Sequence, residues 1–254
     1  LEAWEKAVLD PAYPIAVLLY DGPIAATSNP FEARLIAGLA TKLADRMAGA
    51  KDGRVLSPQF WSSNLAIVSP HRAQNAAIRG ALSPELRPGS FVETVDRIQG
   101  KERDVILLSY TVADAEFATA EAEFIFSSER LNVAITRAKT KLIVMLSKNL
   151  LDAVPSDQEQ MDKAEILREF VFDATPHARL TMQDGMSGTA RVEIRRKGFR
   201  ADDTQDVSLP GGTNDVEIVT LPDHLADLLD TIQRVAMRSS FGTASESELR
   251  KARA

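Results

Sequence analysis

Short apolar runs alternate with helical repeats along about the first 170 residues of the chain. Apolar runs that end at turn residues predict buried strands. Apolar side chains that recur every three or four residues predict helices. The alternation predicts an α/β fold with a mainly parallel sheet and helices on both faces. The predicted strands are residues 15–20, 65–68, 92–95, 105–110 and 141–146, and the predicted helices are residues 31–47, 71–82 and 127–138, with one or two more in 149–172.

A different pattern begins near Pro176, where glycine-rich turns separate shorter elements. We therefore expect a first domain of residues 1–174 and a small accessory α+β region of residues 175–254. The last helices of that region are also compatible with the start of a winged-helix unit. Its predicted elements are strands at residues 190–194 and 216–220 and helices at residues 223–238 and 245–253.

The composition excludes several classes of protein. The chain has 254 residues, 44% of them hydrophobic, which is enough for a packed core. Cysteine is absent, so disulfides and thiolate metal sites are excluded. No apolar run reaches the roughly 18 residues of a membrane span. The net charge of −6 requires any nucleic-acid site to be a local groove or to be shared with another domain. We expect a cytoplasmic protein and, because residue 1 is Leu1, a piece of a longer one.

The helix predicted at residues 127–138 carries the string RLNVAITRAK, in which Arg130 and Arg137 are seven positions apart. At about 100° per residue, both guanidinium groups leave the helix on one face. An adjacent apolar stripe can be buried and so hold the helix in place. Arginines held in this way can stabilise the charge on a γ-phosphate during phosphoryl transfer. The alternative is an arginine pair on a solvated helix face.

A second string, TVDRIQGKERDVIL, spans residues 94–107. Gln99 and Gly100 are expected to turn the chain, and Gly100 permits a close approach of the backbone to a ligand. Glu102 is an acceptor suited to a sugar hydroxyl, and Thr94 can donate its hydroxyl to a nucleic-acid phosphate. The alternative for this string is an ordinary charged turn.

Together the two strings resemble motifs V and VI of superfamily 1 helicases. A third string, AIVSPHRAQ at residues 66–74, is similar to motif IV of the same enzymes, which joins a strand to a helix through a proline turn. The resemblance covers about residues 14–150. The chain resembles the second, C-terminal RecA-like domain of these enzymes, in the branch that contains the nonsense-mediated-decay helicase and senataxin-like proteins.

The resemblance implies roles for individual residues. Arg137 resembles the arginine finger that reaches the γ-phosphate of ATP, and Arg130 is implied to support the same helix and the nucleotide cleft. No metal ligand is implied in this chain. The residues implied beside the nucleotide are Gln99, Gly100 and Glu102, and those implied in the nucleic-acid channel are Pro70, Gln74 and Thr94.

Two elements of a complete ATP site are missing from the sequence. There is no G-x-x-x-x-G-K-[ST] loop and no pair of carboxylates suited to Mg²⁺. The resemblance therefore implies that ATP with Mg²⁺ is bound mainly by an N-terminal RecA-like domain of the same polypeptide, with single-stranded nucleic acid as a further partner. We expect the chain alone not to hydrolyse ATP. The alternative is a RecA-like module that binds nucleic acid or protein without catalysis.

One position departs from the family pattern. The string NPFEA at residues 29–33 aligns with a family element NRxEA, whose arginine also reaches the γ-phosphate. Pro30 stands at that place and carries no charge. Arg34 lies one helical turn further on and is a candidate replacement.

Other features predict less chemistry. The three histidines show no ligand spacing and are expected at the surface or at helix caps. Trp4 and Trp61 are able to stack on bases but are expected to pack against the protein. Residues 195–197, followed by Arg200, form a basic run that either contacts a phosphate backbone or ends a strand in solvent.

Overall fold

The structure is a computed structural model that describes residues 1–47, 59–185, 188–198 and 217–220. Contacts divide the chain into one compact unit, Leu1–Pro222, and a second, Asp223–Ala254. The second unit lies outside the described residues, and so do the helices predicted within it. All the described residues belong to the first unit.

The described strands form one sheet in the order β3-β2-β4-β5-β1-β7-β6-β8. The five strands from β3 to β1 are parallel to one another, whereas β7 is antiparallel to both β1 and β6. The prediction of an α/β fold with a mainly parallel sheet is therefore confirmed. The strands are β1 (Ile15–Asp21), β2 (Leu65–Ser69), β3 (Val92–Thr94), β4 (Arg103–Ser109), β5 (Ala138–Ser147), β6 (Thr175–Asp184), β7 (Gly188–Lys197) and β8 (Glu217–Thr220).

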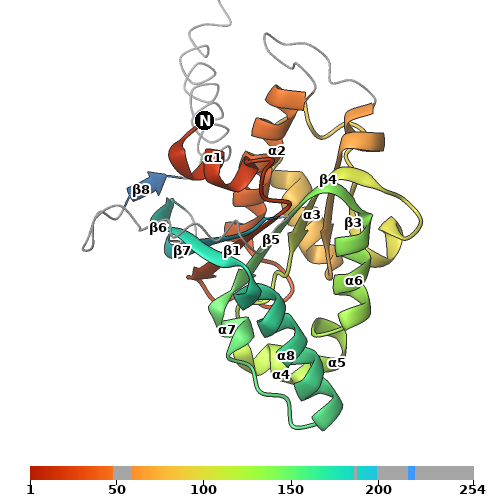
Figure 1. Cartoon of the computed structure of the whole chain (residues 1–254), viewed down its shortest axis with the longest axis vertical. Coiled ribbons are helices and arrows are strands. Elements are labelled where there is room, and N and C mark those ends of the chain that lie inside the picture. Colours follow the sequence, from red (N-terminus) through yellow and green to blue (C-terminus); the bar gives the residue numbers. More distant parts are fainter. Residues whose placement is uncertain (48–58, 186–187, 199–216, 221–254) are drawn as a thin grey trace, which may run out of the picture. The chain divides into compact units, whose positions relative to one another are not determined.

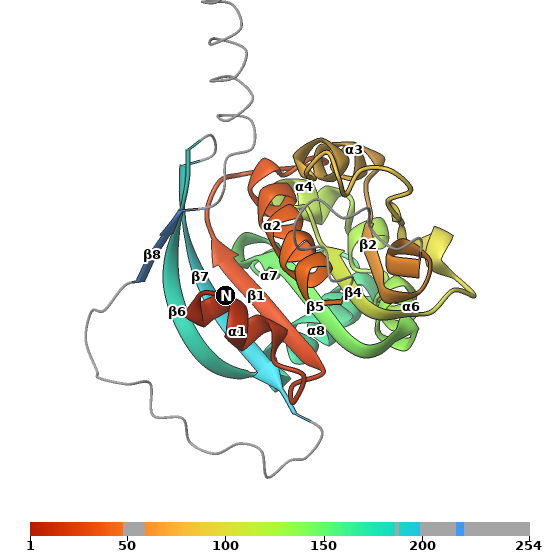
Figure 2. The same ribbon diagram turned by 90° about the horizontal axis from the view of Figure 1, so that it is seen from above.

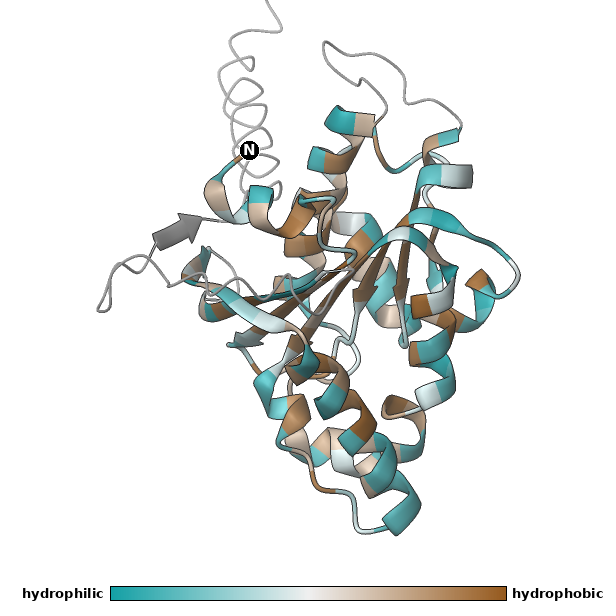
Figure 3. Cartoon of the chain, viewed as in Figure 1, coloured by the Kyte–Doolittle hydropathy of each residue, from teal (hydrophilic) through white to brown (hydrophobic). Residues whose placement is uncertain are grey.

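Helices cover both faces of the sheet (Figure 1). On β1, Leu18 and Tyr20 pack on the face covered by the first three helices, and Val17 and Leu19 pack on the opposite face. Burial on both faces explains the continuous apolar strands, which Figure 3 shows in brown. One face holds α1 (Ala3–Leu9), α2 (Pro30–Met47) and α3 (Arg72–Ala81), and the other holds α4 (Ala115–Ala120), α5 (Ala122–Ile125), α6 (Ser128–Arg137), α7 (Lys148–Leu151) and α8 (Gln158–Asp173).

Two short helical segments complete the described elements, η1 (Phe60–Asn64) and η2 (Val95–Ile98). The first is a π-helix and the second a 3₁₀ helix. None of the helices in the described ranges is long and apolar enough to cross a membrane.

The strands β6 and β7 continue the main sheet beyond the expected domain boundary. β7 pairs with β1, with Leu18 opposite Ile194, and Figure 2 shows β6 and β7 beside β1. β6 was not predicted, because it buries only a few apolar side chains, such as Leu180 and Met182, among polar ones. The assignment of residues 175–254 to an accessory region stays a prediction, although the contacts divide the chain only after Pro222.

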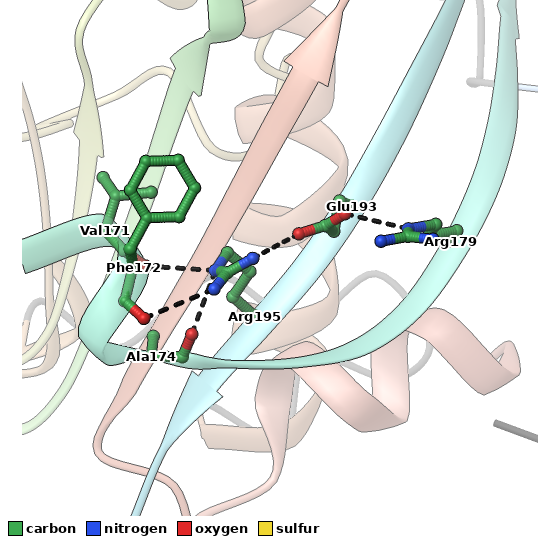
Figure 4. Close-up of polar contacts among 6 residues, drawn as sticks. All are labelled: Val171, Phe172, Ala174, Arg179, Glu193 and Arg195. Carbon is green, nitrogen blue, oxygen red and sulfur yellow. Dashed lines mark hydrogen bonds and ion pairs between the residues drawn. The ribbon is translucent and has the colours of Figure 1, made fainter. Parts of the chain in front are cut away.

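Arg195 on β7 closes the C-terminal end of α8 (Figure 4). Its Nε donates to the carbonyl oxygens of Val171, at 3.1 Å, and Ala174, at 2.9 Å. A guanidinium group at this end also interacts favourably with the helix dipole. The same side chain pairs with Glu193, whose other oxygen accepts a 2.8 Å hydrogen bond from Arg179. The hairpin of β6 and β7 is thereby fastened to α8.

Arg196 points to the opposite face of the sheet. Its guanidinium group lies 3.8 Å from the ring centre of Tyr13 and 3.6 Å from the carboxylate of Asp10. Both expectations for the basic run are therefore wrong for its two arginines, because each is buried and paired within the protein. Lys197 is exposed, and Arg200 lies outside the described residues.

Candidate nucleotide and nucleic-acid sites

The helix α6 is held at its start and along one face. The hydroxyl of Ser127 accepts a hydrogen bond from the backbone N–H of Arg130 at 3.4 Å, as an N-cap residue does. Leu131 and Ala134 are buried against the sheet, and the helix also packs beside η2. The helix ends at Arg137, where β5 begins. The predicted helix is confirmed, whereas its predicted stripe is only partly buried, because Ile135 is half-buried and Ala138 already belongs to β5.

Arg137 and the turn at residues 99–102 meet at the amino ends of β4 and β5. Ala138, the residue after Arg137, pairs with Arg103, the first residue of β4. Next to them, the Nζ of Lys139 lies 3.9 Å from a carboxylate oxygen of Glu102. Two strings that are about 30 positions apart in the sequence therefore form one rim.

The chemistry of this rim fits a nucleotide phosphate. In the part of the chain that the structure describes, the buried Nε of Arg137 has no hydrogen-bond partner. A buried donor without a partner is costly, and phosphate oxygens match the guanidinium fork. Gln99, Gly100 and Glu102 are exposed beside it. Gly100 has a φ of +77°, and a Cβ there would meet nothing within 4 Å, so the backbone is open to a ligand.

Arg130 lies at the other end of α6. Seven residues of helix separate it from Arg137 by about 10 Å along the axis. Its guanidinium group donates to the carbonyl oxygen of Phe124 at 2.8 Å and stacks on that ring at 4.1 Å from the centre. Its Nε is 3.7 Å from the carboxylate of Asp96. These contacts join α6 to α5 and η2, and they do not bring the two arginines together.

Two of the three residues predicted for nucleic acid, Thr94 and Pro70, lie at the carboxyl ends of neighbouring strands. Thr94 ends β3 and pairs with Ser69, the last residue of β2, which Pro70 follows. Beside them is a small hollow, which we call the carboxyl-edge pocket. It is lined by Pro70, Val95, Leu108, Ser109, Tyr110, Phe124, Ile125, Ser127, Arg130 and Leu131.

Gln74 lies behind this edge and not on it. Its side chain is completely buried. The Oε1 atom accepts a 2.7 Å hydrogen bond from the backbone N–H of Asn29, and the Nε2 atom donates to the hydroxyl of Ser109 at 3.0 Å. These hydrogen bonds are internal to the protein, so the Gln74 side chain offers no surface to a ligand.

Comparison with known proteins identifies the family. A family described as an AAA domain matches residues 21–149, about half of the chain. The chain belongs to this family. It is the C-terminal RecA-like domain of superfamily 1 helicases.

Three relatives illustrate how the chain relates to whole helicases. It is 30% identical over 161 residues to the DNA replication ATP-dependent helicase/nuclease JHS1 of Arabidopsis thaliana, which is 60% of this chain and 11% of that protein. It is 32% identical over 159 residues to the DNA replication ATP-dependent helicase/nuclease DNA2 of Mus musculus, 60% of this chain and 14% of that protein. It is 28% identical over 161 residues to the probable helicase MAGATAMA 3 of Arabidopsis thaliana. That alignment covers 61% of this chain and 19% of that protein. The chain thus spans less than a fifth of each.

A buried polar network behind the carboxyl edge of this helicase domain was not predicted. Glu32 is completely buried, and its two oxygens accept hydrogen bonds from the hydroxyl of Tyr20 at 2.7 Å, from the backbone N–H of Thr111 at 3.0 Å and from the hydroxyl of Ser109. Burial raises the pKa of Glu32 to about 7, although these hydrogen bonds lower it. The signal in the sequence was a carboxylate on the apolar stripe of α2.

The NPFEA string starts α2. Asn29 accepts a 3.2 Å hydrogen bond from the backbone N–H of Glu32, and Pro30 occupies the first helical position, where no N–H is needed. Arg34 is 7% exposed and pairs with Asp184 on β6. The suggestion that Arg34 replaces the family arginine is therefore wrong, because its guanidinium group is held inside the domain.

The histidines and tryptophans add no site. His71 precedes α3 and is partly buried, His177 is partly buried on β6, and His224 lies outside the described residues. Trp4 and Trp61 are each 6% exposed, which confirms packing and leaves no face open to a base. Within the described ranges, no three His, Cys, Asp or Glu residues are grouped to hold a metal ion.

Proposed function

We propose that the chain is the C-terminal motor half of an ATP-dependent superfamily 1 DNA or RNA helicase or translocase. In this proposal Arg137 is the arginine finger for ATP that is bound mainly, with Mg²⁺, by an N-terminal RecA-like domain of the same polypeptide. The observation that carries it is the buried Nε of Arg137, which has no partner among the described residues and lies beside an exposed turn. A finger of this kind is worth about 10³ to 10⁵ in rate.

The other residues of the rim support that finger. Gly100 lets the backbone approach the nucleotide, Gln99 and Glu102 offer exposed polar groups, and the Glu102 carboxylate suits a ribose hydroxyl. Arg130 supports the same helix through Asp96 and Phe124 and so holds the finger in place indirectly. Bound ATP supplies the phosphoryl group whose transfer to water drives movement along the strand.

We further propose that single-stranded nucleic acid crosses the carboxyl edge of the sheet. We also propose that the protein is cytoplasmic. The hydroxyl of Thr94 and the turn at Pro70 support this, since both follow adjacent parallel strands at one edge. Gln74 contributes by fixing the start of α2, because its Oε1 binds the Asn29 backbone.

The test measures ATP hydrolysis by the complete polypeptide with and without single-stranded DNA or RNA. Arg137→Ala should lower the stimulated rate by about 100-fold or more, at the low end of finger effects. Arg46→Ala, an exposed arginine at the end of α2, is the matched control and should leave the rate unchanged. An Arg137→Ala enzyme as active as wild type would falsify the assignment. The 254-residue chain alone should not hydrolyse ATP, and arginine-dependent turnover by it would contradict the two-domain site.

The alternative function is a RecA-like module that binds nucleic acid or protein without catalysis. Pro30 favours it, because the charge of the family arginine is missing there. A G-x-x-x-x-G-K-[ST] loop in the polypeptide before Leu1 supports the motor, and its absence supports the binding module.

A further inference from the structure

One carboxyl group lies at the centre of the buried network behind the carboxyl-edge pocket. Glu32 is 0% exposed, and in the described part of the chain no Lys, Arg or His forms an ion pair with it. An apolar side chain would fill this place on the stripe of α2 without the desolvation cost of a carboxyl group. The carboxyl group therefore needs a reason other than packing.

Its hydrogen bonds reach one wall of the pocket. Thr111 has a φ of +69°, a conformation that is strained for a β-branched residue. Its N–H donates to Glu32 at 3.0 Å, and its carbonyl oxygen accepts from the Asn29 amide at 2.9 Å. The turn is thus held from both sides. Ser109 and Tyr110, the two residues before it, line the pocket.

The same network reaches the opposite wall. Pro70 lines the pocket and leads into α3, which carries Gln74. Gln74 donates to the hydroxyl of Ser109 at 3.0 Å, and that hydroxyl in turn donates to Glu32. The two walls, which come from β2–α3 and from the end of β4, are therefore joined by the bond between Gln74 and Ser109, and Glu32 on α2 holds that serine in place.

We propose that Glu32 is a positioning residue for single-stranded nucleic acid. It holds the Ser109–Thr111 turn on α2, so that Ser109 stays in place to bind Gln74 of α3, and it thereby sets the separation of the two pocket walls. This inference rests on the proposed function, because it assigns the strand to the carboxyl edge. Glu32 does not touch the strand and acts through Ser109 and Thr111. Strained turns that are fixed by buried polar groups are common at binding sites.

The experiment determines the concentration of a single-stranded oligonucleotide that half-saturates the ATPase of the complete polypeptide. Glu32→Gln keeps the shape of the side chain but replaces one of the two acceptor oxygens with an NH₂ group, so the side chain is unable to accept from Tyr20, Ser109 and Thr111 all at once. We expect the half-saturating concentration to rise about three- to tenfold, the effect of one or two hydrogen bonds, with a maximal rate within about twofold of wild type. A merely structural role would lower the active fraction and the maximal rate and leave half-saturation unchanged.

A matched variant removes a different bond of the same carboxyl group. Tyr20→Phe deletes the donor to the other oxygen of Glu32 and the acceptor of one Asn29 side-chain bond. The bonds that Glu32 and Asn29 make to the Ser109–Thr111 turn remain, so half-saturation should shift by less than about twofold. Ser109→Ala removes the hydroxyl that joins Gln74 to Glu32 and should raise half-saturation as Glu32→Gln does. This variant keeps the inference testable if Glu32→Gln does not fold.

Two outcomes overturn the inference while the proposed function stands. In the first, the strand stimulates the wild-type enzyme, and the half-saturating concentration of the oligonucleotide is the same in Glu32→Gln and Ser109→Ala as in wild type. The other is an equal shift in Tyr20→Phe, which would indicate general loss of stability. A wild-type polypeptide that the strand does not stimulate overturns the proposed function and this inference together.

Discussion

The ionisation of Glu32 should control part of the pH dependence of stability. Burial raises its pKa from 4.5 to about 7, and the hydrogen bonds from Ser109, Tyr20 and Thr111 only partly offset that effect. Tyr20, which faces the carboxyl group from β1, has a pKa raised well above 10 and stays neutral in this range. Glu32→Gln removes the titrating group while keeping a polar side chain of the same shape.

The expected magnitude follows from the two pKa values. Between pH 4.5 and about 7 the folded chain keeps a proton that the unfolded chain has released. The free energy of unfolding therefore falls as the pH rises, by up to about 1.4 kcal/mol per pH unit. Over the whole interval the loss is about 3 kcal/mol. The stabilising contribution is fully present below pH 4.5 and is gone above about pH 7.

Urea denaturation of the 254-residue chain, followed by circular dichroism between about pH 5 and about pH 8, measures this loss. The difference between wild type and Glu32→Gln should fall by about 2 to 3 kcal/mol across that range, because the contributions of all other groups cancel. Glu169→Gln, at an exposed position on α8, is the matched control variant. A constant difference between wild type and Glu32→Gln would refute the reasoning, since the Glu32 carboxyl group would then titrate alike in both states.

Two further variants test the packing of the hairpin and the open turn. Arg195→Ala should lower the free energy of unfolding by about 3 kcal/mol, because it leaves the buried Glu193 short of a partner and the end of α8 without its donors. Arg191→Ala is the control, because this exposed arginine of the same strand pairs with Asp21 on β1 and not with α8. Similar urea midpoints for the two variants would contradict the capping role. Gly100→Ala should cost about 1 kcal/mol through its positive φ alone, as no atom lies within 4 Å of the added Cβ, whereas Gly38→Ala within α2 should stabilise the chain by about 1 kcal/mol in a thermal melt. Equal shifts of the same sign would show that the backbone conformation of Gly100 has no effect.

Local pattern was enough to predict most of the parallel sheet. The strand predicted at residues 15–20 is β1, and the helix predicted at residues 127–138 is α6, each to within about one residue at either end. These elements are buried on a whole face, so near neighbours in the sequence already carry the periodicity. β6 was missed because it is partly exposed and its alternation is broken by charged residues.

Only part of the candidate site was predicted, because local pattern identifies residues near one another in the sequence and not their partners in the fold. The motif strings indicated Arg137 and the turn at residues 99–102, and the structure brings these together at one rim. The resemblance implied that Arg130 supports the same helix and the nucleotide cleft. Its partners Asp96 and Phe124 lie at the other end of α6 from Arg137, and its role at the cleft stays a prediction. Face periodicity gives the direction of a side chain around a helix and says nothing about what stands opposite it.

The sequence by itself determined the family and the order of the strands and helices up to about residue 172, because both depend on residues close together along the chain. Only the tertiary structure decided the environment of the charged side chains. Glu32 meets Ser109 across 77 positions, and Arg195 reaches the end of α8 across 24. Such contacts depend on which elements become neighbours in the sheet, so the same charge that suggests a solvated surface or a phosphate site in the sequence becomes part of the buried structure in the fold.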